Sequence, residues 1–269
     1  MNNKHRALWG VVALLIVFLA ILIWRMLDPT PRAVAPGNIA TSTPPAVVVP
    51  EPVVITDSGP YHDIEAKYPN ATPLSASAGA EADAQAVGAM KGFVEKLVGA
   101  FKETAISEVP GLGDFGNDRK YAMDVNYEVV EGAKTVSYIY VIYQDTMGAH
   151  PNTYYRTFTF DRASGEDVHL DELFAQGTPY LDRLSQRTRA DLPRIMAKRA
   201  ETTPDQMDRE YINSGTLPIA DAFQNFVIEG NTLRMIFPPY QVGPYVYGTI
   251  EVPIPLADLR DILSTKYVP

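Results

Sequence analysis

An unbroken apolar run of 18 residues near the amino terminus, Ala7–Trp24, constrains this 269-residue chain more than any other feature. As an α-helix rising about 1.5 Å per residue it is roughly 27 Å long, close to the hydrocarbon thickness of a bilayer. The only two tryptophans, Trp9 and Trp24, lie near its ends, where indole rings favour the membrane interface. A cleaved signal peptide usually has a shorter apolar region of about 7–15 residues. We therefore expect an uncleaved transmembrane helix over residues 7–27.

The segments on either side of this run predict how the protein is placed. Residues 1–6 contain Lys4 and Arg6, so we expect a short cytoplasmic stub and a single-pass protein of the cytoplasmic membrane. The large domain then lies in the periplasm or outside the cell. Residues 28–60 hold eight prolines and show neither a helical nor a sustained two-residue period, which predicts an extended linker.

Composition excludes several classes of protein. The chain has no cysteine, which excludes disulfides, thiolate metal sites and cysteine nucleophiles. A formal net charge of −9 argues against nucleic acid as a partner. Hydrophobic residues make up 46% of the chain, enough for a packed core.

Hydrophobic periodicity predicts an α+β fold with antiparallel sheets and packed helices. Leu97 and Phe101 lie on the apolar stripe of one helix, and Val125 and Tyr127 on the apolar side of an alternating strand, so we expect them to share a core. The predicted strands are Tyr61–Tyr68, Tyr121–Val129, Val136–Tyr143, Thr153–Asp161, Phe226–Glu229, Leu233–Phe237 and one around Ile250–Ile254, and the predicted helices are Glu81–Lys102, Pro179–Ala200 (bent or broken at Pro193), Thr203–Ile212 (capped by Thr203) and Leu256–Leu263.

Catalytic motifs are weak in this sequence. None of the four histidines has metal-ligand spacing, so we expect no metal and no cofactor. The stretch Gly111–Gly116 matches G-x-G-x-x-G but lies between an expected helix and a strand, the wrong context for a dinucleotide site. Carboxylates gather between Asp161 and Glu172, where a solvated turn and a helix start explain them better than an acid–base pair.

Two segments stand out as binding loops because they combine rigid prolines with several tyrosines. One is Gly148–Tyr155, between two strands, and the other is Phe237–Gly248. The alternative is that these tyrosines only cap the core. The residues that we expect to meet a ligand are His150, Asn152, Tyr240, Gln241, Pro244, Tyr245 and Tyr247.

These segments also carry a family resemblance. The stretches GAHPNTYYRTFTFDRASGEDVHLDELF and FVIEGNTLRMIFPPYQVGPYVYGTIEVPIPLADLRDIL resemble the RsiV-type extracytoplasmic domain. DIEAKYP, the following helix and YAMDVNYEVV are similar to the PdaC-type N-terminal domain. The resemblance implies two intertwined subdomains, a first of PdaC type over residues 61–147 and a second of RsiV type over residues 148–269. The resemblance implies a pair of domains that forms the outer part of a transmembrane anti-sigma factor and there binds lysozyme. In PdaC-type proteins, the first domain of the pair precedes a zinc-dependent deacetylase domain. Only six residues precede the membrane segment and no deacetylase domain follows, so we expect neither a sigma-factor partner nor deacetylation.

Three functions stay open at this stage. The first is a non-catalytic binding module that recognises cell-wall glycan or a lysozyme-like muramidase. The second is a hydrolase of envelope polysaccharide that uses carboxylates such as Asp161 and Asp167. The third is a structural envelope protein that contacts other proteins through its linker.

Overall fold

The computed structural model describes residues 50–112, 120–264 and 266. The apolar run Ala7–Trp24, the stub before it and most of the predicted linker lie outside these residues. Within the described part of the chain, no helix has both the length and the apolar character needed to cross a bilayer. The fold is a mixed α+β fold built around two sheets.

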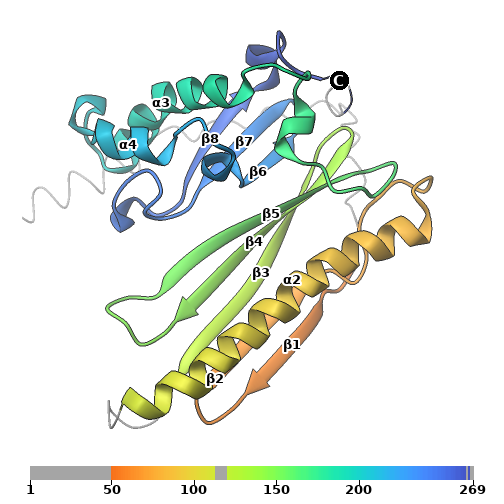
Figure 1. The fold of residues 1–269 in the computed structure, drawn as a ribbon, viewed down its shortest axis with the longest axis vertical. Coiled ribbons are helices and arrows are strands. Elements are labelled where there is room, and N and C mark those ends of the chain that lie inside the picture. Colours follow the sequence, from red (N-terminus) through yellow and green to blue (C-terminus); the bar gives the residue numbers. More distant parts are fainter. Residues whose placement is uncertain (1–49, 113–119, 265, 267–269) are drawn as a thin grey trace, which may run out of the picture. The chain divides into compact units, whose positions relative to one another are not determined.

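The larger sheet has five strands in the order β1-β2-β3-β4-β5 (Figure 1). The last three form the predicted antiparallel meander, and the short turn Gly132–Lys134 separates the first two of them. Its strands are β1 (Val53–Ser58), β2 (His62–Tyr68), β3 (Tyr121–Glu131), β4 (Thr135–Asp145) and β5 (Asn152–Asp161).

Two features of this sheet correct the sequence-based expectations. The sheet is not wholly antiparallel, because β2 pairs with β3 in parallel. Such a pair needs a long crossover, and helix α2 (Gly79–Glu108) supplies it. The predicted linker also ends too late, because Val53–Ser58 forms the edge strand β1. Alternate residues of β1 are half-buried and exposed, a two-residue pattern that the prolines around it conceal.

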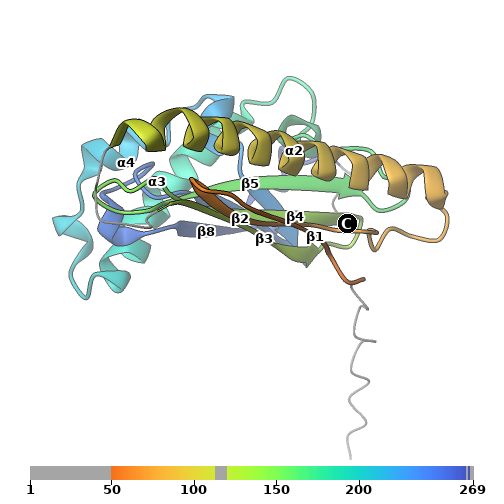
Figure 2. The same ribbon diagram turned by 90° about the horizontal axis from the view of Figure 1, so that it is seen from below.

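Helix α2 covers one face of the five-stranded sheet (Figure 2). The predicted helix Glu81–Lys102 is confirmed and is longer at both ends. The expected core is confirmed as well, because Phe101 and Val125 are buried in one cluster, against which Leu97 and Tyr127 pack. Aromatic rings add to this core: Phe93 on α2 lies edge-on to Tyr140, with ring centroids 5.5 Å apart.

The second sheet is antiparallel, in the order β6-β7-β8, and packs with two helices around a second core. A tight turn at Gly230-Asn231 joins its first two strands, and Gly230 adopts a positive φ of 55° there. The elements are β6 (Phe226–Glu229), β7 (Thr232–Phe237), β8 (Ile250–Pro255), α3 (Tyr180–Arg199) and α4 (Arg209–Gly215).

Three predicted helices differ in detail. Helix α3 is not broken, since it continues through Pro193, which is itself buried on the core side of the helix. The expected helix Thr203–Ile212 is instead a short 3-10 turn followed by α4, whose cap is Asp208, and the Asp208 carboxylate accepts from the Tyr211 N–H at 3.0 Å. The closing helix Leu256–Leu263 is reduced to a 3-10 turn over its first four residues.

The two sheets are joined by β6. Val227 on β6 and Ile236 on β7 pack against Val130 and Ile139 of the larger sheet in a small separate cluster. The predicted division between residues 147 and 148 falls in the loop between β4 and β5. Strand β5 follows that division in the sequence but completes the first sheet.

Candidate functional site

The two predicted binding loops meet in the folded chain. His150 lies on the β4–β5 loop, and Tyr240 and Tyr245 lie on the β7–β8 loop; we call these three residues the aromatic cluster. The imidazole of His150 stacks on the ring of Tyr245, with centroids 4.3 Å apart and planes inclined by 22°. The Tyr240 ring lies 5.5 Å from that of Tyr245 and 6.1 Å from the imidazole. Residues about 90 positions apart therefore form one aromatic platform.

Hydrogen bonds hold the cluster in place. The Nδ1 atom of His150 lies 2.9 Å from the carbonyl oxygen of Pro151 and must donate to it, because a carbonyl only accepts. In the neutral ring Nε2 is then the acceptor, and the Tyr240 hydroxyl donates to it at 2.9 Å. The Tyr245 hydroxyl donates to the same Pro151 carbonyl at 3.2 Å. Both tyrosines are thus bound to the loop that carries the histidine.

The platform is open to solvent. Tyr240 is 48% exposed and Tyr245 36% exposed, while the adjacent Val246 is 84% exposed. Tyr240 also has a φ of 71°, in the left-handed region that a non-glycine residue adopts only where its surroundings enforce it. Exposed, pre-positioned aromatic rings offer a flat apolar surface at low entropic cost. This surface suits the face of a sugar ring or an apolar patch of a protein.

The remaining predicted site residues have other surroundings. Gln241 is turned inward, and its amide nitrogen donates to the carbonyls of Gly215 at 3.0 Å and Ala222 at 2.8 Å. Tyr247 packs against the core of the second subdomain. Asn152 is the first residue of β5 and is half-buried, whereas Pro244 is exposed and precedes the short turn that carries Tyr245. The structure therefore brings together three of the seven predicted residues as a cluster.

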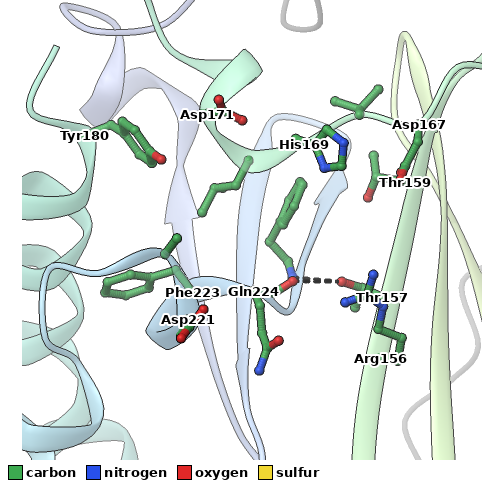
Figure 3. A pocket seen from close by; sticks show the side chains of 14 residues that line it. Arg156, Thr157, Thr159, Asp167, His169, Asp171, Tyr180, Asp221, Phe223 and Gln224 are labelled. Carbon is green, nitrogen blue, oxygen red and sulfur yellow. Dashed lines mark hydrogen bonds between the residues drawn. The ribbon is translucent and has the colours of Figure 1, made fainter. Parts of the chain in front are cut away.

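A separate pocket of about 370 Å³ lies between β5, the segment that follows it, and the segment before β6 (Figure 3). Asp167 and Asp221 lie on opposite sides of it, on these two segments. The Thr157 hydroxyl accepts from the Phe226 N–H at 3.1 Å and so holds the segment before β6 against β5. The pocket joins stretches more than 40 residues apart without a local motif, so sequence patterns did not indicate Asp221 or Arg156.

The carboxylates considered for catalysis are split by the structure. Asp161 shapes a turn, since one of its oxygens accepts from the N–H groups of Ala163 and Ser164 at 2.8 and 2.9 Å. Only Asp167 of the proposed pair lines the pocket. Across residues 50–112, 120–264 and 266, no group of three His, Asp or Glu side chains is arranged to hold a metal ion.

Comparisons with known proteins give a consistent but distant relationship. Residues 171–257 match the family described as a protein of unknown function, DUF3298. The peptidoglycan-N-acetylmuramic acid deacetylase PdaC of Bacillus subtilis is 27% identical over 67% of this chain. A Mycobacterium tuberculosis protein named as an esterase is 28% identical over 51% of the chain. The chain spans 36% of the length of PdaC and 58% of that of the esterase.

Solved structures share the fold. A DUF3298 family protein from Pseudomonas aeruginosa PAO1 superposes with a TM-score of 0.53 at 13% identity, covering 81% of this chain and 95% of that protein. A second, from Bacteroides fragilis, gives 0.51 at 16% identity, covering 80% and 93%. The mixed α+β fold with two sheets is therefore the fold of DUF3298 structures.

Proposed function

We propose that this protein is a non-catalytic module that binds cell-wall glycan through the aromatic cluster. The observation that carries this proposal is the stacked and exposed platform of His150, Tyr240 and Tyr245, fixed by hydrogen bonds between two loops. Sugar rings present C–H faces that pack on aromatic rings, and their hydroxyls can bond to the tyrosine oxygens. The similarity to a peptidoglycan deacetylase supports glycan as the ligand class.

The proposal includes the placement of the protein. The apolar run Ala7–Trp24 anchors it in the cytoplasmic membrane, and the folded residues lie on the outer side, where peptidoglycan is found. The prolines between them keep the domain at a distance from the bilayer. Protease added to spheroplasts digests the domain in this arrangement, and full protection of the domain contradicts it.

Glycan binding is tested by titration calorimetry with peptidoglycan glycan chains from which the peptides have been removed. Tyr245→Ala removes the ring that stacks on the imidazole and is expected to weaken binding by about 2 kcal/mol, or roughly 30-fold. The matched control is Tyr154→Ala, because Tyr154 is 49% exposed and is not part of the aromatic cluster. It is paired with Ile142, so it lies on the face of the larger sheet that α2 covers. Equal affinities of the parent and the folded Tyr245 variant refute the proposal.

The same variants decide between a glycan and a protein as the ligand. The RsiV-type resemblance implies a lysozyme-like muramidase on this surface. Lysozyme is therefore titrated beside the glycan chains. Binding of lysozyme that depends on Tyr245, with no binding of glycan, replaces the glycan proposal by the protein one.

Hydrolysis is the second candidate, and the pocket favours it. Asp167 lines an open pocket of about 370 Å³, a volume in the range of small-molecule binding sites. Two relatives are named as a deacetylase and an esterase. Turnover of peptidoglycan or of an ester substrate that is lost in Asp167→Asn supports this candidate. Binding without turnover supports the non-catalytic module.

A further inference from the structure

The outer edge of β5 is only partly covered. Near its carboxyl end the Thr159 carbonyl accepts from the Val168 N–H at 2.7 Å, so the following segment pairs with that end. Main-chain groups of alternate residues in an antiparallel strand point the same way, so those of Thr153 and Tyr155 face this edge too. For these groups, no main-chain hydrogen bond outside the pairing with β4 is found in the described part of the chain. The first half of β5 can therefore pair with another extended chain.

This open edge connects the aromatic cluster to the pocket. His150 lies two residues before the start of β5, and Arg156, Thr157 and Thr159 of that strand line the pocket. The stretch from Asn152 to Thr157 spans roughly 17 Å at about 3.4 Å per residue. That length matches a peptide of about four or five extended residues.

The pocket at the end of this edge carries an excess of negative charge. Asp167, Asp171 and Asp221 line it, and all three are exposed. Among the ion pairs of the described residues, none joins these carboxylates to a lysine or an arginine. The basic residue on the pocket wall is Arg156, whose guanidinium lies over the Phe158 ring. A ligand with an ammonium group, and with a carboxylate to face Arg156, complements these charges.

We propose that the β5 edge and the pocket bind a short extended peptide with a free amino group, namely the peptide stem of peptidoglycan. This inference rests on the proposed function, because the glycan that carries the stem occupies the aromatic cluster. Main-chain hydrogen bonds along Thr153 and Tyr155 supply affinity. The carboxylates of the pocket select the amino group at the far end.

Three probes separate the peptide from the glycan: glycan chains with stems, the same chains stripped of stems by an amidase, and stem-bearing chains whose amino groups have been acetylated. The parent protein is expected to bind the first at least about fivefold more tightly than the second, since several exposed charge pairs add about 1 kcal/mol or more. Acetylation is expected to reduce that difference, because it removes the ammonium charge that faces the pocket carboxylates and leaves the main-chain hydrogen bonds.

Two variants test the two parts of the groove. Asp167→Asn combined with Asp221→Asn removes two charges from the pocket, and Thr153→Pro removes an edge N–H that makes no bond to β4. Each is expected to bind stem-bearing chains more weakly than the parent does, with the affinity for stripped chains unchanged. Asp205→Asn combined with Glu103→Gln is the matched control, because it also removes two negative charges, from exposed side chains outside the pocket.

The outcomes distinguish the inference from the proposed function. Equal affinity of the parent for stem-bearing and stripped chains overturns the peptide inference and leaves glycan binding in place. An effect of the two-charge control variant as large as that of the pocket variant also overturns it, since the attraction is then unspecific. Binding of free stem peptide that Tyr245→Ala does not affect supports the groove, even where stripped glycan fails to bind.

Discussion

Replacing Gln241 by alanine tests how the β7–β8 loop is held. The amide nitrogen of Gln241 donates to the carbonyl of Gly215, the last residue of α4, and to that of Ala222, on the connection between α4 and β6. Each neutral hydrogen bond contributes about 0.5–1.5 kcal/mol, so the loss of both predicts a decrease of about 1–3 kcal/mol in the free energy of unfolding. Without this amide, the loop that carries Tyr240 and Tyr245 loses two of its hydrogen bonds to the rest of the second subdomain.

Urea denaturation followed by circular dichroism measures this change, with the free energy obtained by linear extrapolation. Gln176→Ala is the matched control, because Gln176 is exposed in a loop and its side chain makes no hydrogen bond within the described residues. A decrease below about 0.5 kcal/mol for Gln241→Ala, or an equal decrease in the control, refutes the view that this amide fastens the loop.

Three further predictions concern stability. Phe101→Ala removes a buried ring of α2 and is expected to lower the free energy of unfolding by about 3–5 kcal/mol, measured by thermal or chemical denaturation. A decrease below about 0.5 kcal/mol shows that this ring is not part of the core. Gly215→Ala places a Cβ 1.8 Å from the main-chain oxygen of Gln241 and is expected to lower the free energy of unfolding by about 1–3 kcal/mol. Gly92→Ala on α2 places a Cβ in open space and should raise the free energy of unfolding by about 0.5–1 kcal/mol; similar effects of the two variants contradict this. The hydrogen bond from Lys102 lowers the pKa of the Asp57 carboxyl in the folded protein. The ionised carboxylate therefore stabilises the fold above pH 3.8, and this stabilisation is lost as the pH falls through the lower pKa of the folded state. Asp57→Asn should make the melting temperature fall less steeply with acid, and an unchanged decline argues against this pairing.

Local patterns predicted most elements and part of the site. The alternation from Tyr121 to Val129 follows the burial of β3, because one face of that strand packs on α2 and the other is half-covered. The aromatic loops were found because proline and tyrosine together mark rigid exposed turns. The sequence predicted that His150 and Tyr245 belong to one binding site, but not that their rings stack. That contact depends on how the two sheets pack together.

What sequence patterns missed depends on partners distant in the chain. Strand β1 was overlooked because its flanking prolines dominate the local composition, while its strand character comes from pairing with β2. The parallel pairing of β2 and β3 has no local signature. Thr203 and Asp208 are both acceptable caps by residue type; in the structure Thr203 precedes only a 3-10 turn, and Asp208 caps α4. Gln241 was predicted to meet a ligand because it lies in an aromatic loop. Its sequence context alone does not tell whether its amide binds a ligand or, as in the structure, main-chain carbonyls.

The position of β5 determines where this protein can be cut or recombined. A fragment that ends at residue 147 keeps β4 but loses β5, so an 11-residue strand that is largely buried on both faces becomes a sheet edge. Long apolar edges pair with other chains, so such a fragment is expected to aggregate when expressed alone. A hybrid joined in the turn after Asp161 keeps the five-stranded sheet in one piece. The useful crossover point for exchanging halves between relatives thus lies after the fifth strand, some fifteen residues beyond the boundary that loop composition suggests.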